Sequence, residues 1–401
     1  MKRVVVVGAS TGGLATAEAL RRAGHEGPIT LVGAEPAMPY DRPPLSKQVL
    51  TGQRGPNELA LRSSAEIDAL DLDLRLGVPA AGLDIGRREV LLEDGIRLDY
   101  DELVVATGVR ARRLPGTGGI AGVHTLRTVS DALALKERLR PGRRLVVVGA
   151  GFVGAEVAAA ANGLGVHVTL LESAPVPLAA AVGDATGRFL AAMHRDHGVG
   201  IRADVRVTEI VQDGGQVSGV RLEDGSVLPA DDVLVAIGSV ANTEWLADSG
   251  LAVQEGLVCD EYSAAGPGVY GVGDVARWHN PLFDVTMRIE HRTNAAEQGL
   301  AVARNLLCPE TRRPFAPVPY FWSDQYDVKV QAYGYLRDHD EALVLDNTTS
   351  ASGRLLVIYR KADRLVGVLA VGASPKVLRA WRALIAGSTA WTAVLNRTIA
   401  A

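Results

Sequence analysis

The sequence predicts an α/β protein built from two similar parallel-sheet domains and a smaller α+β unit at its C-terminal end. Two observations lead to this prediction. A buried strand, a glycine-rich turn and a helix follow one another near residue 4 and again near residue 144, and each copy is followed by a hairpin and a second apolar strand. Beyond residue 319 the pattern changes to alternating strands, which indicates a separate unit.

The first glycine turn joins a strand to a helix. Val4–Val7 is a run of valines, as expected for a strand buried on both faces of a parallel sheet. It leads through Gly8-Ala9-Ser10-Thr11-Gly12-Gly13 into the helical segment Leu14–Leu20. Glycines at such a turn let the backbone approach a pyrophosphate, whose charge then lies against the free N–H groups of the helix. The turn departs from the G-x-G-x-x-G pattern because Ser10 replaces its second glycine.

The second turn has the complete pattern. Arg144–Val148 predicts the strand, Gly149-Ala150-Gly151-Phe152-Val153-Gly154 is a full G-x-G-x-x-G, and Val157–Ala161 predicts the helix. A single glycine turn between a strand and a helix can result from tight packing alone. Two turns with the same flanking elements instead indicate two dinucleotide sites and two Rossmann-like domains.

An acidic residue closes each predicted site. The strand Ile29–Val32 leads to Glu35, and the strand Val166–Leu171 ends at Glu172. A carboxylate about 20 residues after the turn is placed to hydrogen-bond an adenosine ribose. No Lys or Arg follows Glu172 through Ala181, so the second site is predicted to take NADH rather than NADPH.

The later segments of the two halves also correspond. Each half continues with a hairpin and then an apolar strand that ends in a small-residue turn. The hairpin turns are Glu93-Asp94-Gly95 and Glu223-Asp224-Gly225. The strand ends are Ala106-Thr107-Gly108 and Ala236-Ile237-Gly238. A further strand ends at Gly273-Asp274, and residues 293 to 307 predict a helix. The stretch from Pro36 to Lys47 is a proline-stiffened loop with two cations, either a solvated loop or, from its place after the first ribose site, part of that site.

Composition sets limits on function. A net charge of −4 gives no basic field for nucleic acid, and charged residues at 22% with hydrophobic residues at 47% indicate a soluble globular chain. Cys259 and Cys308 have no C-x-x-C spacing, so neither a metal site nor a redox dithiol is predicted. No apolar run reaches the ~20 residues of a spanning helix. A cytoplasmic protein is therefore expected.

The C-terminal segment predicts strands around Val328–Val330, Leu355–Tyr359 and Leu365–Val371, and a final helix that opens at Ser374-Pro375. That helix carries an apolar side flanked by cations. The apolar residues are Val377, Leu378, Trp381, Leu384 and Ile385, and the cations are Lys376, Arg379 and Arg382. This stripe either packs the small unit or anchors it at a membrane interface.

Together these residues resemble the FAD-dependent, NADH-linked ferredoxin reductases that serve bacterial cytochromes P450 and Rieske oxygenases. The likeness covers essentially the whole chain. Its specific parts are both glycine turns, Pro-Tyr-Asp-Arg-Pro-Pro-Leu-Ser-Lys at 39–47, Ala106-Thr107-Gly108, Glu156, Gly273-Asp274, and Phe-Trp-Ser-Asp-Gln-Tyr at 321–326. The resemblance implies an FAD-binding domain (1–111 and 241–317) interrupted by an NAD-binding domain (112–240), and a C-terminal α+β interface domain (318–401).

The resemblance also implies residue roles. FAD would be bound by Gly8, Ser10, Thr11, Gly12, Gly13, Glu35, Arg42, Lys47, Ala80, Thr107, Gly108, Arg127, Asp274, Arg292 and Trp322, and NADH by Gly149, Gly151, Phe152, Val153, Gly154, Glu172 and Gly238. Lys47, beside the flavin ring and paired with Glu156, would be the catalytic group. A cation there favours the anionic reduced flavin, and a buried lysine tolerates the place only if it is paired.

Three positions depart from the family. Ala34 stands where the family often has the first of two acidic residues, so Glu35 alone would hold the ribose. Ser10 is tolerable in the turn if its backbone keeps an ordinary φ. Arg292 replaces an apolar or tryptophan residue near the flavin, which puts one contact in doubt.

The predicted function is hydride transfer from NADH to FAD, followed by single-electron transfer to a small [2Fe-2S] ferredoxin. That partner is expected to dock through cations such as Arg288, Arg292 and Arg304, in a transient, electrostatic complex. Disulfide reductases and NADH peroxidases need a cysteine beside the flavin, and Pro43-Pro44-Leu45-Ser46 offers none. A rubredoxin reductase, a quinone reductase and a non-catalytic redox-sensing flavoprotein stay open as alternatives.

Overall fold

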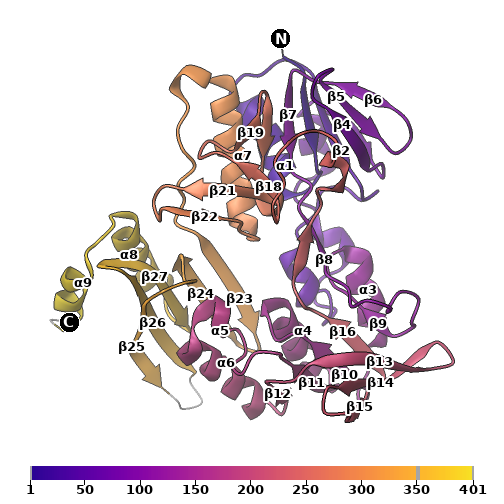
Figure 1. The fold of residues 1–401 in the computed structure, drawn as a ribbon, viewed down its shortest axis with the longest axis vertical. Helices are drawn as coiled ribbons and strands as arrows, with labels where there is room; N and C mark the ends of the chain where they lie inside the picture. The colour runs from indigo at the N-terminus through magenta and orange to yellow at the C-terminus, as the bar shows by residue number, and fades with distance from the viewer. Residues whose placement is uncertain (1, 349–352, 400–401) are drawn as a thin grey trace. The chain divides into compact units, whose positions relative to one another are not determined.

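The structure is a computed structural model that describes residues 2–348 and 353–399, and it divides into two compact units (Figure 1). Unit 1 contains Met1–Asp41, Asn57–Arg110 and Val240–Pro317, and unit 2 contains Arg42–Pro56, Ala111–Ser239 and Val318–Ala401. The chain passes between the units at the 3-10 helix η2 (Pro56–Leu59) and at the strands β8 (Val109–Ala111) and β17 (Ser239–Ala241).

Unit 1 is built on a six-stranded sheet whose central strands are parallel. In sheet order the strands are β19 (Ala264–Gly266), β20 (Val269–Gly271), β7 (Glu102–Val105), β1 (Val4–Val7), β2 (Ile29–Gly33) and β3 (Asp73–Leu76). The register places Val4 beside Ile29 on one side and beside Glu102 on the other. The run of valines in β1 is buried on both faces, as a central parallel strand requires.

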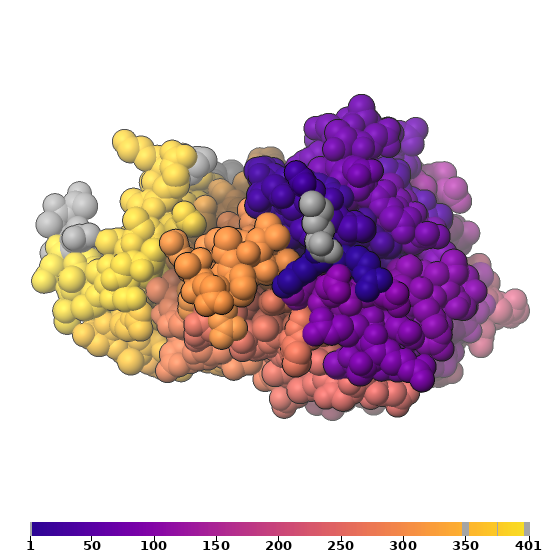
Figure 2. Space-filling model, turned by 90° about the horizontal axis from the view of Figure 1, so that it is seen from above, coloured from indigo at the N-terminus to yellow at the C-terminus, as the bar shows by residue number. Residues whose placement is uncertain are grey.

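Helix α1 (Thr11–Arg22) and helix α7 (Arg292–Leu307) pack against each other in unit 1. Segments far apart in the sequence therefore lie side by side, and Figure 2 shows the indigo N-terminal segment beside orange residues of the α7 region. A Cβ on Gly299 would lie 2.8 Å from the Gly12 carbonyl oxygen, so the two helices approach closely only because no side chain stands there.

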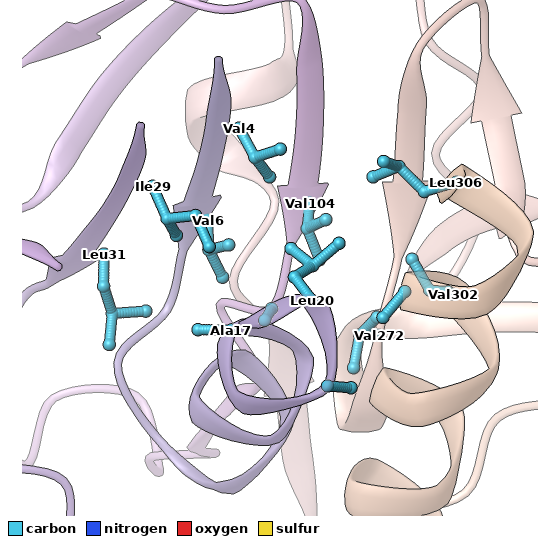
Figure 3. Close-up of a cluster of buried hydrophobic side chains, with 13 residues drawn as sticks. Val4, Val6, Ala17, Leu20, Ile29, Leu31, Val104, Val272, Val302 and Leu306 are labelled. Carbon is cyan, nitrogen blue, oxygen red and sulfur yellow. The ribbon is translucent and has the colours of Figure 1, made fainter. Parts of the chain in front are cut away.

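Figure 3 shows the core beneath these helices, with Ala17 and Leu20 of α1 turned toward Val6 and Val104 of the sheet and Val302 contributed by α7. The rest of unit 1 surrounds this core. It consists of the sheet β4 (Ala80–Asp84), β5 (Glu89–Leu92), β6 (Arg97–Asp99), the sheet β18 (Leu257–Cys259), β21 (Ala276–Asn280), β22 (Val285–Met287), helix α2 (Ser64–Asp68), and the 3-10 helices η3 (Glu244–Leu246), η4 (Gly273–Val275) and η5 (Pro309–Thr311).

Unit 2 contains a second parallel sheet. Its strands, in sheet order, are β12 (Gly200–Arg202), β11 (His167–Leu171), β10 (Arg144–Val148), β16 (Asp232–Val235) and β9 (Val123–His124). The accompanying elements are η1 (Pro43–Ser46), α3 (Val129–Arg138), α4 (Phe152–Gly163), α5 (Ala179–Val182), α6 (Asp184–Asp196) and the antiparallel sheet β13 (Val207–Asp213), β14 (Gln216–Leu222), β15 (Val227–Pro229). The order of elements repeats that of unit 1, as predicted.

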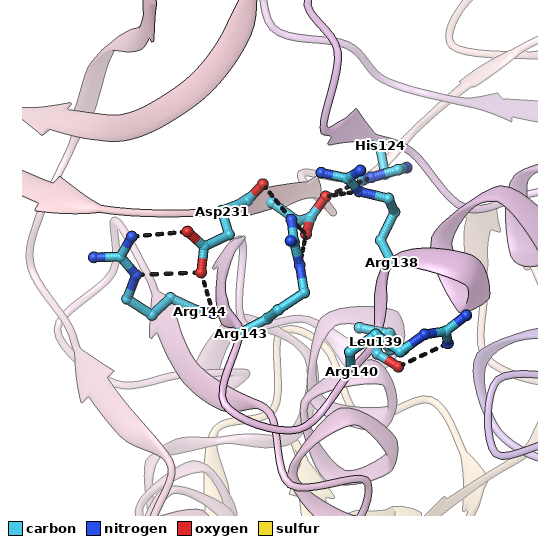
Figure 4. Close-up of polar contacts among 8 residues, drawn as sticks. His124, Arg138, Leu139, Arg140, Arg143, Arg144 and Asp231 are labelled. Carbon is cyan, nitrogen blue, oxygen red and sulfur yellow. Dashed lines mark hydrogen bonds and ion pairs between the residues drawn. The ribbon is translucent and has the colours of Figure 1, made fainter.

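The start of β16 is fixed by two buried or half-buried carboxylates (Figure 4). Asp232 is 2% exposed and accepts from Arg138 at 2.8 Å, Arg143 at 2.7 Å and His124 at 3.3 Å. Burial raises the pKa of Asp232, but these donors outweigh it and lower the pKa below its ordinary value. Asp231 pairs with Arg144 in the same way, so this ion-pair cluster holds β16 beside β10.

The C-terminal part of unit 2 is an antiparallel sheet with two helices. The strands, in sheet order, are β23 (Tyr320–Gln325), β24 (Val328–Gly334), β27 (Arg364–Val371), β26 (Arg354–Lys361) and β25 (Glu341–Thr348), and the helices are α8 (Pro375–Ala386) and α9 (Trp391–Ile399). Val182 and Leu190, from the α5–α6 hairpin, share a core with Val357 and Leu369 of this sheet.

The predicted fold class is confirmed, and three details differ from the sequence reading. Strand β25 was not predicted, and the helix that opens at Ser374 is followed by another, α9, so it is not the final one. The apolar side of α8 is divided, because Leu378 and Ile385 are buried whereas Val377 is 40% exposed. Within residues 2–348 and 353–399, no helix has the length and apolar character to cross a membrane.

Candidate functional site

The first glycine turn is closed so tightly that side chains cannot enter it. Gly8 has a φ of +124°, and a Cβ there would lie 2.0 Å from the Ala106 carbonyl oxygen. A Cβ on Gly13 would lie 1.9 Å from the Gly8 carbonyl oxygen. Ser10 precedes α1 with a φ of −128°, an ordinary extended value, so serine is accommodated where the pattern has glycine.

The first turn of α7 completes this part of unit 1. A Cβ on Gly12 would meet Val272 Cγ1 at 2.9 Å and would lie 3.6 Å from the Ala295 carbonyl oxygen, so α7 begins close to the glycine turn. Beside Ala295, Asn294 is 3% exposed, and its amide nitrogen and oxygen have no hydrogen-bond partner among the described residues. A buried amide in this state is costly unless a ligand satisfies it. The cradle and the amide therefore fit a bound dinucleotide.

The other predicted FAD residues of unit 1 lie on strand ends and loops. Glu35, after β2, accepts from the Tyr40 hydroxyl at 2.5 Å. Thr107 and Asn242 exchange two hydrogen bonds, which fix the turn at Gly108. Ala80 begins β4, and Asp274 lies in η4 directly after the strand end at Gly273.

Arg292, the residue that departs from the family, is the first residue of α7. Its Nε donates to the Asp41 carboxylate at 2.5 Å. The guanidinium is therefore paired within unit 1, and Asp41 belongs to the proline loop whose next residues lie in unit 2.

The second glycine turn repeats the geometry of the first. Gly149 has a φ of +101°, and a Cβ on Gly154 would lie 2.1 Å from the Gly149 carbonyl oxygen. Nothing lies within 4 Å of the Cβ position of Gly151, which leaves that backbone open to a ligand. Glu172 is held by the turn itself, because it accepts from the backbone N–H of Ala150 at 3.0 Å. This places a fixed carboxylate at the expected ribose position.

Lys47 and Glu156 form a buried ion pair in unit 2. Their side chains are 12% and 7% exposed, and Lys47 Nζ lies 2.6 Å from Glu156 Oε2. The same oxygen accepts from the Ser46 hydroxyl, and Ser323 donates to Oε1 at 2.7 Å. Such a pair is stable when the remaining lone pairs are satisfied, as they are here.

Sequence reasoning did not assign roles to Ser46, Ser323 or Asn294. The two serines stood inside the two most diagnostic motifs, and their place beside the acidic residue is a matter of tertiary structure. Asn294 carried no sequence pattern that sets it apart.

The remaining predicted residues of unit 2 lie around the same segments. Arg42 donates to the Arg127 carbonyl oxygen at 2.8 Å. Phe152 packs against Phe321 with ring centroids 4.8 Å apart, and Trp322 stacks on Tyr320 at 5.9 Å. Val153 is 42% exposed, and Gly238 has a φ of +94°.

The cysteines take no part in this geometry. Cys259 is buried in unit 1, and burial raises its pKa to about 12, which makes it a poor nucleophile. Cys308 is exposed at the end of α7. In the described part of the chain, no group of His, Cys, Asp and Glu is arranged to hold a metal ion.

Residues 2–299 match the family described as pyridine nucleotide-disulphide oxidoreductase, and residues 320–396 match the reductase C-terminal domain. The chain belongs to this family of oxidoreductases. Its glycine turns and carboxylates fit the FAD and NADH that were predicted as cofactors, and this prediction is confirmed by the family.

Individual relatives extend along nearly the whole chain. Putidaredoxin reductase of Pseudomonas putida is 38% identical over 91% of this chain and 87% of its own length, and a rubredoxin-NAD(+) reductase of Pseudomonas putida is 34% identical over 90% and 94%. The crystal structure of the covalent putidaredoxin reductase–putidaredoxin complex matches with a TM-score of 0.92 at 36% identity, covering 96% of this chain and 93% of that one. The predicted resemblance to ferredoxin reductases is thereby confirmed.

Proposed function

We propose that this oxidoreductase takes a hydride from NADH onto FAD and passes single electrons to a small [2Fe-2S] ferredoxin that serves a cytochrome P450 or Rieske oxygenase. The observation that carries the proposal is the likeness to a putidaredoxin reductase over about nine-tenths of both chains, C-terminal domain included. Bound FAD accepts two electrons together and returns them singly, which a one-electron acceptor requires.

We propose the following roles for the chain's own residues. The glycine turn of unit 1, with Glu35, Asp274 and Asn294, binds FAD, and the glycine turn of unit 2, with Glu172, binds NADH. Lys47, held by Glu156, supplies the positive charge that stabilises the reduced flavin. The remaining residues named above as FAD or NADH contacts keep those roles in this proposal.

The domain boundaries belong to the same proposal. Residues 1–111 and 241–317 form the FAD-binding domain, residues 112–240 the NAD-binding domain and residues 318–401 the interface domain. Use of NADH, together with cysteines that are both free thiols in the structure, supports a cytoplasmic location.

For the docking surface we propose the exposed end of α7. Of the three expected cations, Arg288 is paired with Glu290 at 2.8 Å and Arg292 with Asp41 at 2.5 Å. Arg304 is exposed and donates to two neutral groups, the Asn305 side-chain oxygen and the Arg313 carbonyl oxygen. It therefore presents more unbalanced charge to an acidic partner than the other two do.

The proposal is tested by steady-state rates with a panel of ferredoxins from the same genome. The ferredoxin-dependent rate is expected to fall steeply with added salt, while NADH-to-ferricyanide turnover barely changes, because only the first needs electrostatic docking. Arg304→Glu should raise KM for ferredoxin and leave KM for NADH unchanged; Arg22→Glu, in helix α1, is the control. Equal salt responses of the two rates would contradict the docking surface.

The same assay separates the alternatives. Faster turnover with a rubredoxin than with any ferredoxin would favour the rubredoxin reductase function that the similarity to such an enzyme also supports. Turnover with a quinone alone would favour a quinone reductase. A yellow protein that NADH reduces slowly, and that reduces no acceptor, would favour a redox-sensing flavoprotein.

A further inference from the structure

A buried chain of hydrogen bonds runs from helix α6 to Glu156 in unit 2. His194 Nε2 lies 3.0 Å from Gln325 Oε1, and Gln325 Nε2 donates to Ser323 Oγ at 3.1 Å. Ser323 Oγ in turn donates to Glu156 Oε1 at 2.7 Å. His194 is 3% exposed, and Gln325 and Ser323 are fully buried. Three separate elements, α6, β23 and α4, are thus joined by one set of side chains.

The direction of this chain is fixed by the carboxylate at its end. Glu156 can only accept, so the single hydroxyl proton of Ser323 points to it, and Ser323 Oγ must accept from the amide nitrogen of Gln325. The amide oxygen of Gln325 then faces His194, which therefore carries its proton on Nε2. The opposite orientation would place two oxygens face to face beside a buried charge.

The outer end of the chain agrees with this orientation. His194 Nδ1 lies 2.8 Å from the Tyr326 hydroxyl, which donates to it when Nε2 carries the ring proton. Burial lowers the pKa of His194 to about 4, so the ring is neutral near pH 7 and Nδ1 is free to accept. Tyr326 is held by stacking on His197, with ring centroids 3.7 Å apart.

We propose that His194 is a positioning residue for the Lys47–Glu156 pair, acting through Gln325 and Ser323. It fixes the amide of Gln325, which fixes the Ser323 hydroxyl as a donor to Glu156. The carboxylate then keeps the orientation in which its other oxygen holds Lys47. This inference rests on the proposed function, in which Lys47 stabilises the reduced flavin.

The test variants each change one member of the hydrogen-bond chain. His194→Leu removes the donor, and His194→Gln restores an amide N–H in a similar place. Ser323→Ala removes the last link. His167→Leu is the control, since His167 is an exposed histidine on β11 of the same unit, away from His194, Gln325, Ser323 and Tyr326. Flavin content of each purified full-length chain establishes that it is folded.

Two measurements are made on each variant. Stopped-flow reduction of the flavin by saturating NADH, without any acceptor, is expected to slow about tenfold in His194→Leu, because the Ser323 hydroxyl is then no longer held as a donor to the charged Glu156. The double variant His194→Leu with Ser323→Ala should reduce its flavin no more slowly than the slower of the two single variants, because both changes break the same chain of hydrogen bonds. His194→Gln should recover most of the rate, and His167→Leu should match the wild type.

The second measurement does not depend on turnover. 15N NMR of the histidine-labelled chain with oxidised FAD bound should show His194 as a single tautomer with its proton on Nε2, and Ser323→Ala should release it to a mixture. A mixed tautomer in the wild type, or equal flavin reduction in His194→Leu and the wild type, would overturn the inference. If the wild type shows the single tautomer but NADH does not reduce its bound flavin, the proposed function fails while the hydrogen-bond chain stands.

Discussion

A buried polar group lies near each of the two glycine turns, and the two groups differ in how they are satisfied. At the glycine turn of unit 1, the amide of Asn294 is buried without a partner among the described residues. Beyond the glycine turn of unit 2, the carboxylate of Glu156 is equally buried but accepts from Ser46 and Ser323 and pairs with Lys47. The buried amide beside the turn of unit 1 is therefore left available to a ligand, whereas unit 2 satisfies the buried Glu156 charge from its own side chains.

The carboxylates at the two ribose positions differ in a similar way. Glu35 is held by a side chain, the Tyr40 hydroxyl, from the loop that follows it. Glu172 is held by backbone N–H groups, that of Ala150 in the glycine turn and that of Ala174. A carboxylate fixed by the backbone discriminates more sharply between ligands, because it cannot turn away from an unfavourable charge.

The largest expected effect comes from adding one methyl group to each turn. Gly13→Ala places a Cβ at 1.9 Å from the Gly8 carbonyl oxygen, which forces the turn open, so the protein should be purified without flavin. Gly154→Ala should keep the flavin but need at least about tenfold more NADH to reduce it. Absorbance at the flavin band and NADH titration measure the two outcomes.

Gly163→Ala, at the end of α4, is the control for both changes, since nothing lies within 4 Å of its Cβ position and no cofactor contact is proposed for it. Its melting temperature should match that of the wild type. Loss of flavin in Gly154→Ala, with flavin retained in Gly13→Ala, would reverse the assignment of the two turns.

The next effect concerns nucleotide choice. A 2′-phosphate close to Glu172 would cost about 4 kcal/mol at an effective dielectric near 20, or about a thousandfold in kcat/KM in favour of NADH. Glu172→Ala combined with Ser173→Arg should reverse the preference. Glu35→Ala, the corresponding change in unit 1, should leave the NADH/NADPH ratio as it is, and equal wild-type values of kcat/KM would refute the prediction.

Removal of FAD should destabilise unit 1 selectively. At a free FAD concentration of 100 times its Kd, binding contributes about 2.7 kcal/mol. Hydrogen exchange of the flavin-free chain should therefore speed up in β1, β2 and α7, while α6 and β23 change little. An equal increase in the exchange rates of both units on FAD removal would show that unit 2 also depends on the cofactor.

The smallest effect is an acid sensitivity of unit 2. Burial lowers the pKa of His194 to about 4 from 6.5, so the folded state binds fewer protons than the unfolded state between these values. Stability is therefore present above pH 6.5 and is lost as pH falls toward 4, by about 2 kcal/mol between pH 7 and pH 5. Urea denaturation at the two pH values measures this loss. His194→Gln should remove this pH-dependent loss, and His167→Gln, a change at an exposed histidine of β11, should not.

The sequence predicted the parallel strands and the glycine turns because each depends on local pattern. Val4–Val7 and Arg144–Val148 are apolar runs typical of buried strands, and the strongly positive φ values at Gly8 and Gly149 favour glycine at the turns that follow them. The strand β25 was missed because Asp346 and Asn347 interrupt its apolar pattern, and a bulge shifts its register between Val344 and Asp346.

The candidate site was predicted in part. The pairing of Lys47 with Glu156 was predicted from the resemblance to a family, and the structure places Lys47 Nζ 2.6 Å from Glu156 Oε2. The supporting side chains were not predicted. A histidine on an amphipathic helix, such as His194, has the same appearance in a sequence whether it is buried or exposed.

By itself the sequence determined the two strand–turn–helix segments that are predicted to bind dinucleotides, since a turn of glycines between an apolar strand and a helix is a local requirement of close backbone approach. Only the tertiary structure decided which polar groups are buried and which side chains are their hydrogen-bond partners. His194 in α6, Gln325 and Ser323 in β23, and Glu156 in α4 come from three elements, and the hydrogen bonds that join β23 to the two helices depend on how these elements pack. Packing brings such groups together through contacts distant in sequence, and no local pattern records them.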